Sequence, residues 1–144
     1  MNNFDIRPTQ MRDLPDLRLL LDKTELFPSE MLEEMIRPAL AGEVDAIWLS
    51  GLLDGTAISL CFAEPEPMAD AVWNMRALAV LPAYQGKGFG TQIVSSLEQR
   101  LSESHQRLLI VDTSGTEDFA LTRQFYLQSG YEEEARIRDY WENG

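Results

Sequence analysis

The stretch that most restricts the fold is YQGKGFGTQ, residues 84–92, which places three glycines within five positions. It follows an apolar run that ends at Pro82. It precedes apolar residues at helical spacing, namely Phe89, Ile93, Leu97 and Leu101. The pattern predicts a strand, a tight glycine turn and a helix in immediate succession.

The same stretch has the chemistry of an anion site. The first N–H groups of a helix have no partner within it, and the helix dipole places positive charge there. Glycines let a large anion approach those groups closely, while Gln85 and Lys87 add donors. We therefore expect a phosphate or diphosphate site. The alternative is a turn that only joins strand to helix, and the glycine spacing alone does not decide between them.

Two common nucleotide-binding loops are excluded by spacing. A Walker loop requires Gly-Lys-Ser/Thr after a glycine and four residues, whereas Lys87 precedes the second glycine here. A dinucleotide fingerprint requires Gly-x-Gly-x-x-Gly, whereas Gly86, Gly88 and Gly90 are spaced two and two.

The remaining chain alternates helical and extended patterns. Strands are predicted at 4–8, 45–51, 55–64, 71–82, 106–114 and 132–141, and helices at 9–24, 28–42, about 89–103 and 117–130. Thr9 is the predicted N-cap of the first helix, whose main part begins near Pro15, and Asp54-Gly55 predicts a hairpin. Strand 106–114 is continuously apolar, as in strands buried on both faces. We expect a single α/β (α+β) domain over 1–144, with a three-layer mixed sheet of about six strands and helices on both faces.

Composition excludes several classes of function. The formal net charge of −12 repels phosphate backbones, so we expect no nucleic-acid partner. One cysteine, Cys61, and one histidine, His105, make a zinc site unexpected, and we predict no metal. Apolar runs are far too short to span a membrane and no secretory signal is visible, so we expect a cytoplasmic protein without membrane contact.

A second motif gives the glycine loop a family context. Gln85, Gly88 and Gly90 form Gln-x-x-Gly-x-Gly, and Tyr126 stands four residues before the pair Gly130-Tyr131. Together these motifs closely resemble the GNAT superfamily of acyl-CoA N-acyltransferases. The resemblance covers residues 71–138, roughly half of the chain, and the preceding part matches in element order only.

The resemblance implies acetyl-CoA as co-substrate, with its pantetheine arm between strands 71–81 and 106–113. Backbone groups of Leu78 and Val80 would pair with the pantetheine amides as an added strand does. An N–H in that strand would stabilise the thioester oxyanion. The remaining cofactor contacts would come from Gln85, Gly86, Lys87, Gly88, Phe89, Gly90, Thr91 and Thr122.

The resemblance also assigns the proton transfers. Tyr126 stands at the family position of the acid that protonates the departing thiolate. The base that accepts the proton of the amine is either Glu64 or Asp112, each at a predicted strand end, and both remain open. Asn74 and Arg76 would line the acceptor pocket, since alternation places them on one face with Leu78 and Val80, whereas Trp73 and Met75 face the other way.

Two features depart from the family pattern. Phe119 replaces the usual asparagine seven residues before the tyrosine, so the cofactor contact would fall partly to Thr122 and Arg123. The sequence also lacks the family's seventh strand, which would leave an open edge on strand 106–113. We expect either strand 132–141 or a second subunit, in a homodimer, to cover that edge.

The predicted function is transfer of an acetyl group from acetyl-CoA to a primary amine of a small molecule or protein, by direct attack in a ternary complex. The alternative is a CoA-binding or regulatory module without catalysis, which needs the glycine loop but neither Tyr126 nor an acceptor pocket. A toxin that acts on aminoacylated transfer RNA fits poorly with the net charge.

Overall fold

The computed structural model describes residues 3–106, 108–111 and 125–126. The chain divides into two units, Met1–Val111 and Asp112–Gly144. The elements of the first unit are, in order, β1 Phe4–Pro8, η1 Met11–Asp13, α1 Leu14–Thr24, η2 Ser29–Met31, α2 Leu32–Leu40, β2 Ile47–Leu53, β3 Thr56–Pro65, β4 Val72–Val80, η3 Pro82–Tyr84, α3 Phe89–Glu103 and β5 Leu108–Val111. The predicted single domain over 1–144 stays a prediction, and predicted strand 132–141 lies outside the described residues.

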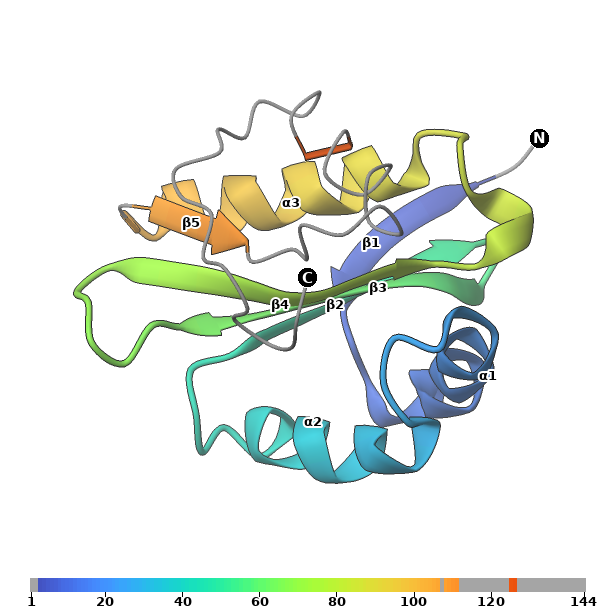
Figure 1. Cartoon of the computed structure of the whole chain (residues 1–144), viewed down its shortest axis with the longest axis horizontal. Coiled ribbons are helices and arrows are strands. Elements are labelled where there is room, and N and C mark those ends of the chain that lie inside the picture. The colour runs from blue at the N-terminus through green and yellow to red at the C-terminus, as the bar shows by residue number, and fades with distance from the viewer. Residues whose placement is uncertain (1–2, 107, 112–124, 127–144) are drawn as a thin grey trace, which may run out of the picture. The chain divides into compact units, whose positions relative to one another are not determined.

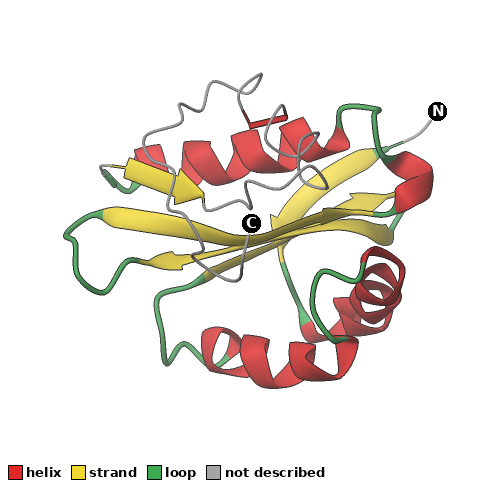
Figure 2. Ribbon diagram, viewed as in Figure 1, coloured by secondary structure: helices red, strands yellow, loops and turns green. Residues whose placement is uncertain are grey.

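The five strands form one mixed sheet in the order β1-β2-β3-β4-β5. The first four are antiparallel, and β5 runs parallel to β4. Helix α3 covers one face of the sheet, and α1 and α2 cover the other (Figures 1 and 2). The predicted mixed α+β fold with helices on both faces is confirmed. No helix in the described part of the chain is long and apolar enough to cross a membrane.

Each face of the sheet buries its own apolar layer. Leu17 and Leu20 of α1 pack with the stacked rings of Trp48 and Phe62, whose centroids lie 4.1 Å apart. On the α3 face the fully buried residues include Leu49, Cys61, Ile93 and Leu97. Burial raises the pKa of the Cys61 thiol to about 12, which is consistent with a packing role.

The turn chemistry of the β2–β3 hairpin follows the sequence closely. Asp54 and Gly55 both have positive φ, at 50° and 88°, as a two-residue type I′ turn requires. Leu53 and Thr56 close the ladder on either side. The predicted hairpin is therefore confirmed.

Two local predictions are wrong. Thr9 does not cap a helix, because it is buried and its hydroxyl lies 2.8 Å from Ser50 Oγ, while Gln10 precedes η1. Strand β5 is not buried on both faces within Leu108–Val111, since Leu108 is 55% exposed and the other three residues are half-buried. A continuous apolar run in the sequence thus does not by itself determine that both faces of its strand are buried.

A β-bulge in β4 changes which residues share a face. Ala77 pairs with Phe62 and Met75 pairs with Ala63, so Arg76 is the extra residue. Asn74 therefore lies on the α1 and α2 face, whereas Leu78, paired with Cys61, lies on the α3 face. The prediction that Asn74 shares a face with Leu78 and Val80 is wrong, because the inserted residue reverses the alternation.

Candidate functional site

The glycine loop presents unbonded backbone donors at the start of α3. Gly86 and Gly88 have φ of 76° and 90°, and Gly88 is the N-cap of this 15-residue helix. Within the described residues, none of the N–H groups of 86–91 bonds an acceptor. A β-carbon at either glycine would meet no atom within 4 Å, so their role is conformational. The loop therefore has the donor geometry that anion binding requires.

Both polar side chains of the loop have internal partners. Gln85 donates through Nε2 to the carbonyl oxygen of Val80 at 2.9 Å. Lys87 Nζ lies 5.9 Å from the centroid of the Tyr84 ring, within cation–π range. Tyr84 in turn meets Phe89 edge to face at 6.2 Å. These contacts hold Gln85 and Lys87 close to the backbone donors of the loop.

The outer edge of β4 is open beside this loop. Leu81 donates its N–H to Ile58 at 2.9 Å, so the backbone of residue 81 points toward β3. Because backbone groups alternate along a strand, those of Leu78 and Val80 point away from β3. Strand β5 pairs only with Val72–Met75. In the described part of the chain, the edge at Leu78 and Val80 is thus available for an added strand-like ligand.

The end of the β3–β4 ladder carries a cluster of charged and polar side chains. Arg76 Nε lies 3.1 Å from Glu64 Oε1, and Arg76 Nη2 lies 3.7 Å from Glu66 Oε2. Buried Asn74 donates to Glu66 Oε2 at 3.4 Å. The structure therefore brings together the predicted Glu64, Asn74 and Arg76, and adds Glu66.

Glu66 was missed by sequence reasoning, although a signal existed. Glu64 and Glu66 are two residues apart, the spacing at which strand residues share a face. Pro65 between them suggested a strand end and a polar loop. In the structure β3 continues through Pro65, and Glu66 donates its N–H to the carbonyl of Val72 at 2.8 Å.

Three predicted residues lie elsewhere in the chain. Asp112 and Thr122 lie outside the described residues. Tyr126 is described together with Phe125, both helical, with ring centroids 5.3 Å apart in an edge-to-face arrangement. Their assignments stay predictions.

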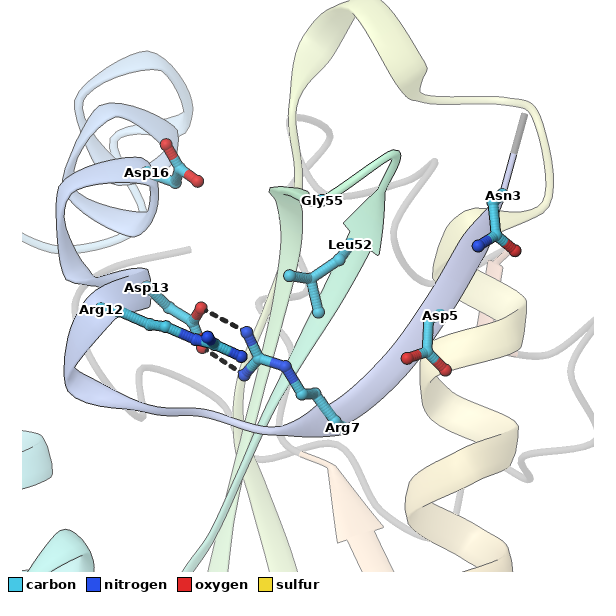
Figure 3. A pocket seen from close by; sticks show the side chains of 8 residues that line it. All are labelled: Asn3, Asp5, Arg7, Arg12, Asp13, Asp16, Leu52 and Gly55. Atoms are coloured by element: carbon cyan, nitrogen blue, oxygen red, sulfur yellow. Dashed lines mark hydrogen bonds and ion pairs between the residues drawn. The ribbon is translucent and has the colours of Figure 1, made fainter. Parts of the chain in front are cut away.

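A cavity of about 430 Å³ opens at the other edge of the sheet, between β1, the turn η1 and the hairpin (Figure 3). None of the predicted site residues lines it. Its wall includes a two-pronged ion pair in which both nitrogens of the Arg7 fork lie 2.7 Å from the carboxylate of Asp13 (Figure 3).

Asp13 is held as a buried carboxylate. Burial opposes its ionisation, but the hydrogen bonds from Arg7 and the N–H of Gln10, the charge of Arg7, and the bond from Ser50 outweigh that effect. The pKa of Asp13 therefore lies below its usual value. The pair ties β1, η1 and β2 together, which is a structural role.

Comparison with known families finds a match over the part of the chain that contains the glycine loop. The family model for the acetyltransferase (GNAT) domain matches residues 45–133, which is more than half of the chain. That range runs from the start of β2 through the glycine loop and past Tyr126. No curated protein matches the chain.

Solved structures with the same fold include several acetyltransferases. A GNAT-family protein from Desulfovibrio desulfuricans superposes with a TM-score of 0.88 at 21% identity, over 99% of this chain and 93% of that one. The aminoglycoside N-acetyltransferase AAC(6')-Iy, solved with a bisubstrate analogue of CoA, gives 0.81 at 19% identity, over 99% of both chains. The ribosomal-protein-S18-alanine N-acetyltransferase from Escherichia coli gives 0.75 at 17% identity, over 98% of this chain and 84% of that one. At these identities the similarity establishes the fold.

Proposed function

The chain belongs to the GNAT acetyltransferase family, and on that premise we propose that it transfers an acetyl group from acetyl-CoA to a primary amine of a small molecule or protein. The observation that carries this proposal is the glycine loop, whose N–H groups at 86–91 are unbonded within the described residues and open α3 beside the part of the β4 edge that no described strand pairs with. A diphosphate and an amide-bearing arm, joined as in coenzyme A, match those two neighbouring features.

In this proposal the cofactor is held mainly by backbone groups. The N–H groups of residues 86–90 bind the diphosphate, since that of Gln85 already donates to Pro82 O, and Lys87 adds a positive charge. Leu78 and Val80 pair with the pantetheine amides along the open edge. A backbone N–H of the same strand stabilises the oxyanion as the amine nitrogen attacks the thioester carbonyl. Of the other predicted contacts, Phe89 and Thr91 lie in the first turn of α3.

Attack in the ternary complex requires two proton transfers. The base first takes a proton from the ammonium group of the acceptor. The neutral nitrogen then bonds to the carbonyl carbon, the carbon–sulfur bond breaks, and the second proton that the nitrogen loses balances the one that the thiolate takes up. Glu64 is the base that the geometry favours, because it stands in a cluster whose two carboxylates attract a protonated amine. Asp112 remains the other candidate. Tyr126 supplies the proton that the departing thiolate takes up.

The acceptor class follows from the same cluster. Two carboxylates and one guanidinium give Glu64, Glu66 and Arg76 a net negative charge. A cationic amine suits that charge, as does the net charge of −12 for the whole chain. Proteins of the same fold act on an aminoglycoside and on the alanine of a ribosomal protein, so both small-molecule and protein amines are candidates.

The experiment that tests the function is a screen of amines with acetyl-CoA, in which release of free thiol is measured. The panel should contain aminoglycosides, polyamines, amino acids and peptides with free N-termini. Thiol release that depends on one amine class is expected. Tight binding of CoA without turnover on any amine would favour a CoA-binding module without catalysis.

A further inference from the structure

The bond from Gln85 to Val80 occupies a backbone carbonyl that the proposed function requires for the cofactor. Gln85 Nε2 donates to Val80 O at 2.9 Å, across five residues. The Gln85 side chain is exposed, so no packing against the core fixes it in this position. The bond closes the turn between the end of β4 and the glycine loop.

The direction of the Val80 carbonyl limits how any donor can reach it. The N–H of Leu81 points toward β3, where it bonds Ile58, so the neighbouring Val80 groups point to the outer edge. A donor must therefore approach Val80 O from the open side of β4. Gln85 already bonds it there. An arm laid along the same edge would reach the oxygen from the same side.

The two competing donors are chemically alike. The side chain of glutamine ends in a carboxamide, and the pantetheine arm of coenzyme A contains two amides, so each offers an N–H to the carbonyl. A strand-like ligand pairs through such amides in register with the backbone. In the structure, Gln85 provides a hydrogen bond of the kind that such an amide would make.

We infer that Gln85 holds the place of a pantetheine amide at Val80 O, and that binding of coenzyme A displaces it. The inference rests on the proposed function and adds to it a regulation of the same site. In this exchange Val80 O accepts a hydrogen bond from Gln85 before coenzyme A binds and from the pantetheine arm afterwards. Binding of the arm therefore competes with the bond from Gln85. Ligands that carry only the nucleotide end do not require the exchange.

A pair of crystal structures tests the exchange directly. 3′-Phospho-ADP has the nucleotide and the diphosphate of coenzyme A but no pantetheine arm. With this ligand, Gln85 Nε2 should remain within about 3.5 Å of Val80 O, the usual hydrogen-bond limit. With coenzyme A, a pantetheine N–H should replace it. A complex with coenzyme A in which Gln85 still donates to Val80 would overturn the inference.

A binding measurement tests the same point in solution. The ratio of the Kd for 3′-phospho-ADP to that for coenzyme A reports what the arm contributes. Gln85→Met removes the donor at similar length, so the ratio should rise about two- to tenfold, as loss of one competing hydrogen bond allows. Gln92→Met, at an exposed glutamine of α3, is the matched control and should leave the ratio unchanged.

The other outcomes are separable. A ratio that stays constant or falls in Gln85→Met would overturn the exchange, because Gln85 would then act as a fixed brace or as a contact to the bound arm. If neither ligand binds the unaltered chain, the proposed function fails, and the exchange fails with it. Binding of both ligands with an unchanged ratio contradicts the exchange alone.

Discussion

The ring of Phe4 lies 4.5 Å from the ring of Phe89, measured between centroids, so the first strand contacts the first residue of α3. Gly51 makes this contact possible, because a β-carbon there would overlap Ser59 Oγ and lie 2.8 Å from the ring of Phe4. The first residue of α3 thus packs against Phe4, and Phe4 in turn lies over Gly51, where a side chain would not fit.

Gly51→Ala should lower the free energy of unfolding by about 1–3 kcal/mol, because overpacking at a buried site forces its neighbours to move. Urea denaturation followed by tryptophan fluorescence measures the change. Adding Ser59→Ala should recover part of the loss, since it removes the overlapping hydroxyl. A double variant no more stable than Gly51→Ala would show that the Phe4 contact dominates.

Asp13→Asn should destabilise the protein in a pH-dependent way. Because the folded-state pKa of Asp13 is lowered, its stabilisation is fully present above the unfolded pKa, about 3.9, and is lost as pH falls through the lower folded value. We expect a loss of about 2 kcal/mol at pH 7 that shrinks below pH ~4. Asp5→Asn, at an exposed carboxylate on the same cavity, is the control. Equal losses at pH 7 and pH 3 would contradict this assignment.

Gly88→Val should abolish the rise in melting temperature that acetyl-CoA produces. Its φ of 90° is unfavourable for a β-branched residue, so the loop would have to rearrange. Gly42→Val is a matched control, since Gly42 has φ of 73°, equally open surroundings and a place after α2, remote in sequence from the loop. Both variants should lose stability, but only Gly42→Val should keep the full ligand shift. Retention of that shift by Gly88→Val would exclude the loop as the diphosphate site.

Glu64→Gln should lower kcat at least tenfold if Glu64 accepts the proton of the amine. Glu66→Gln removes the same charge from the same cluster, so it should raise KM for the amine and leave kcat within about twofold. Steady-state kinetics on the best amine of the screen would separate the two roles. If both substitutions had equal effects on kcat and KM, Glu64 would contribute only its negative charge to binding of the amine. Asp112 would then be the remaining candidate base.

Tyr126→Phe should lower kcat by about tenfold or more while the Kd for acetyl-CoA changes little, because the hydroxyl acts on the leaving thiolate. Tyr84→Phe removes a hydroxyl beside the glycine loop while keeping the ring that Lys87 contacts, and it should change neither quantity. Unaltered turnover in Tyr126→Phe would remove Tyr126 from the mechanism.

The elements that local chemistry determines were predictable from sequence. The glycine loop, α3 and the Asp54-Gly55 hairpin depend on neighbouring residues, and the structure confirms them. The burial of β5 and the partners of Thr9 were not predictable, because both depend on segments far apart in the chain. Arg7 and Asp13 carry no pattern that would pair them, since the sequence predicts a helix over residues 9–24, where the structure has the turn η1 before α1.

Within the candidate site, the sequence predicts Glu64 as one of two possible bases and Asn74 and Arg76 as residues of the acceptor pocket, but not the contacts among them. Strict alternation places Arg76 with Leu78, and nothing in WNMRAL marks Arg76 as an extra residue. The bulge becomes visible only through the register of β3 against β4. Glu66 was missed for a related reason, because the strand continues past Pro65.

The bulge at Arg76 divides strand β4 into two segments with different roles. Before the bulge, Asn74 turns its side chain toward the charged cluster. After it, Leu78 and Val80 turn main-chain groups away from β3, toward the outer edge of β4. In the proposed function, changes of side chain in the first segment would therefore alter which amine is accepted without disturbing how the acyl donor is held. A family that keeps one donor while diversifying its acceptors would gain from such a division.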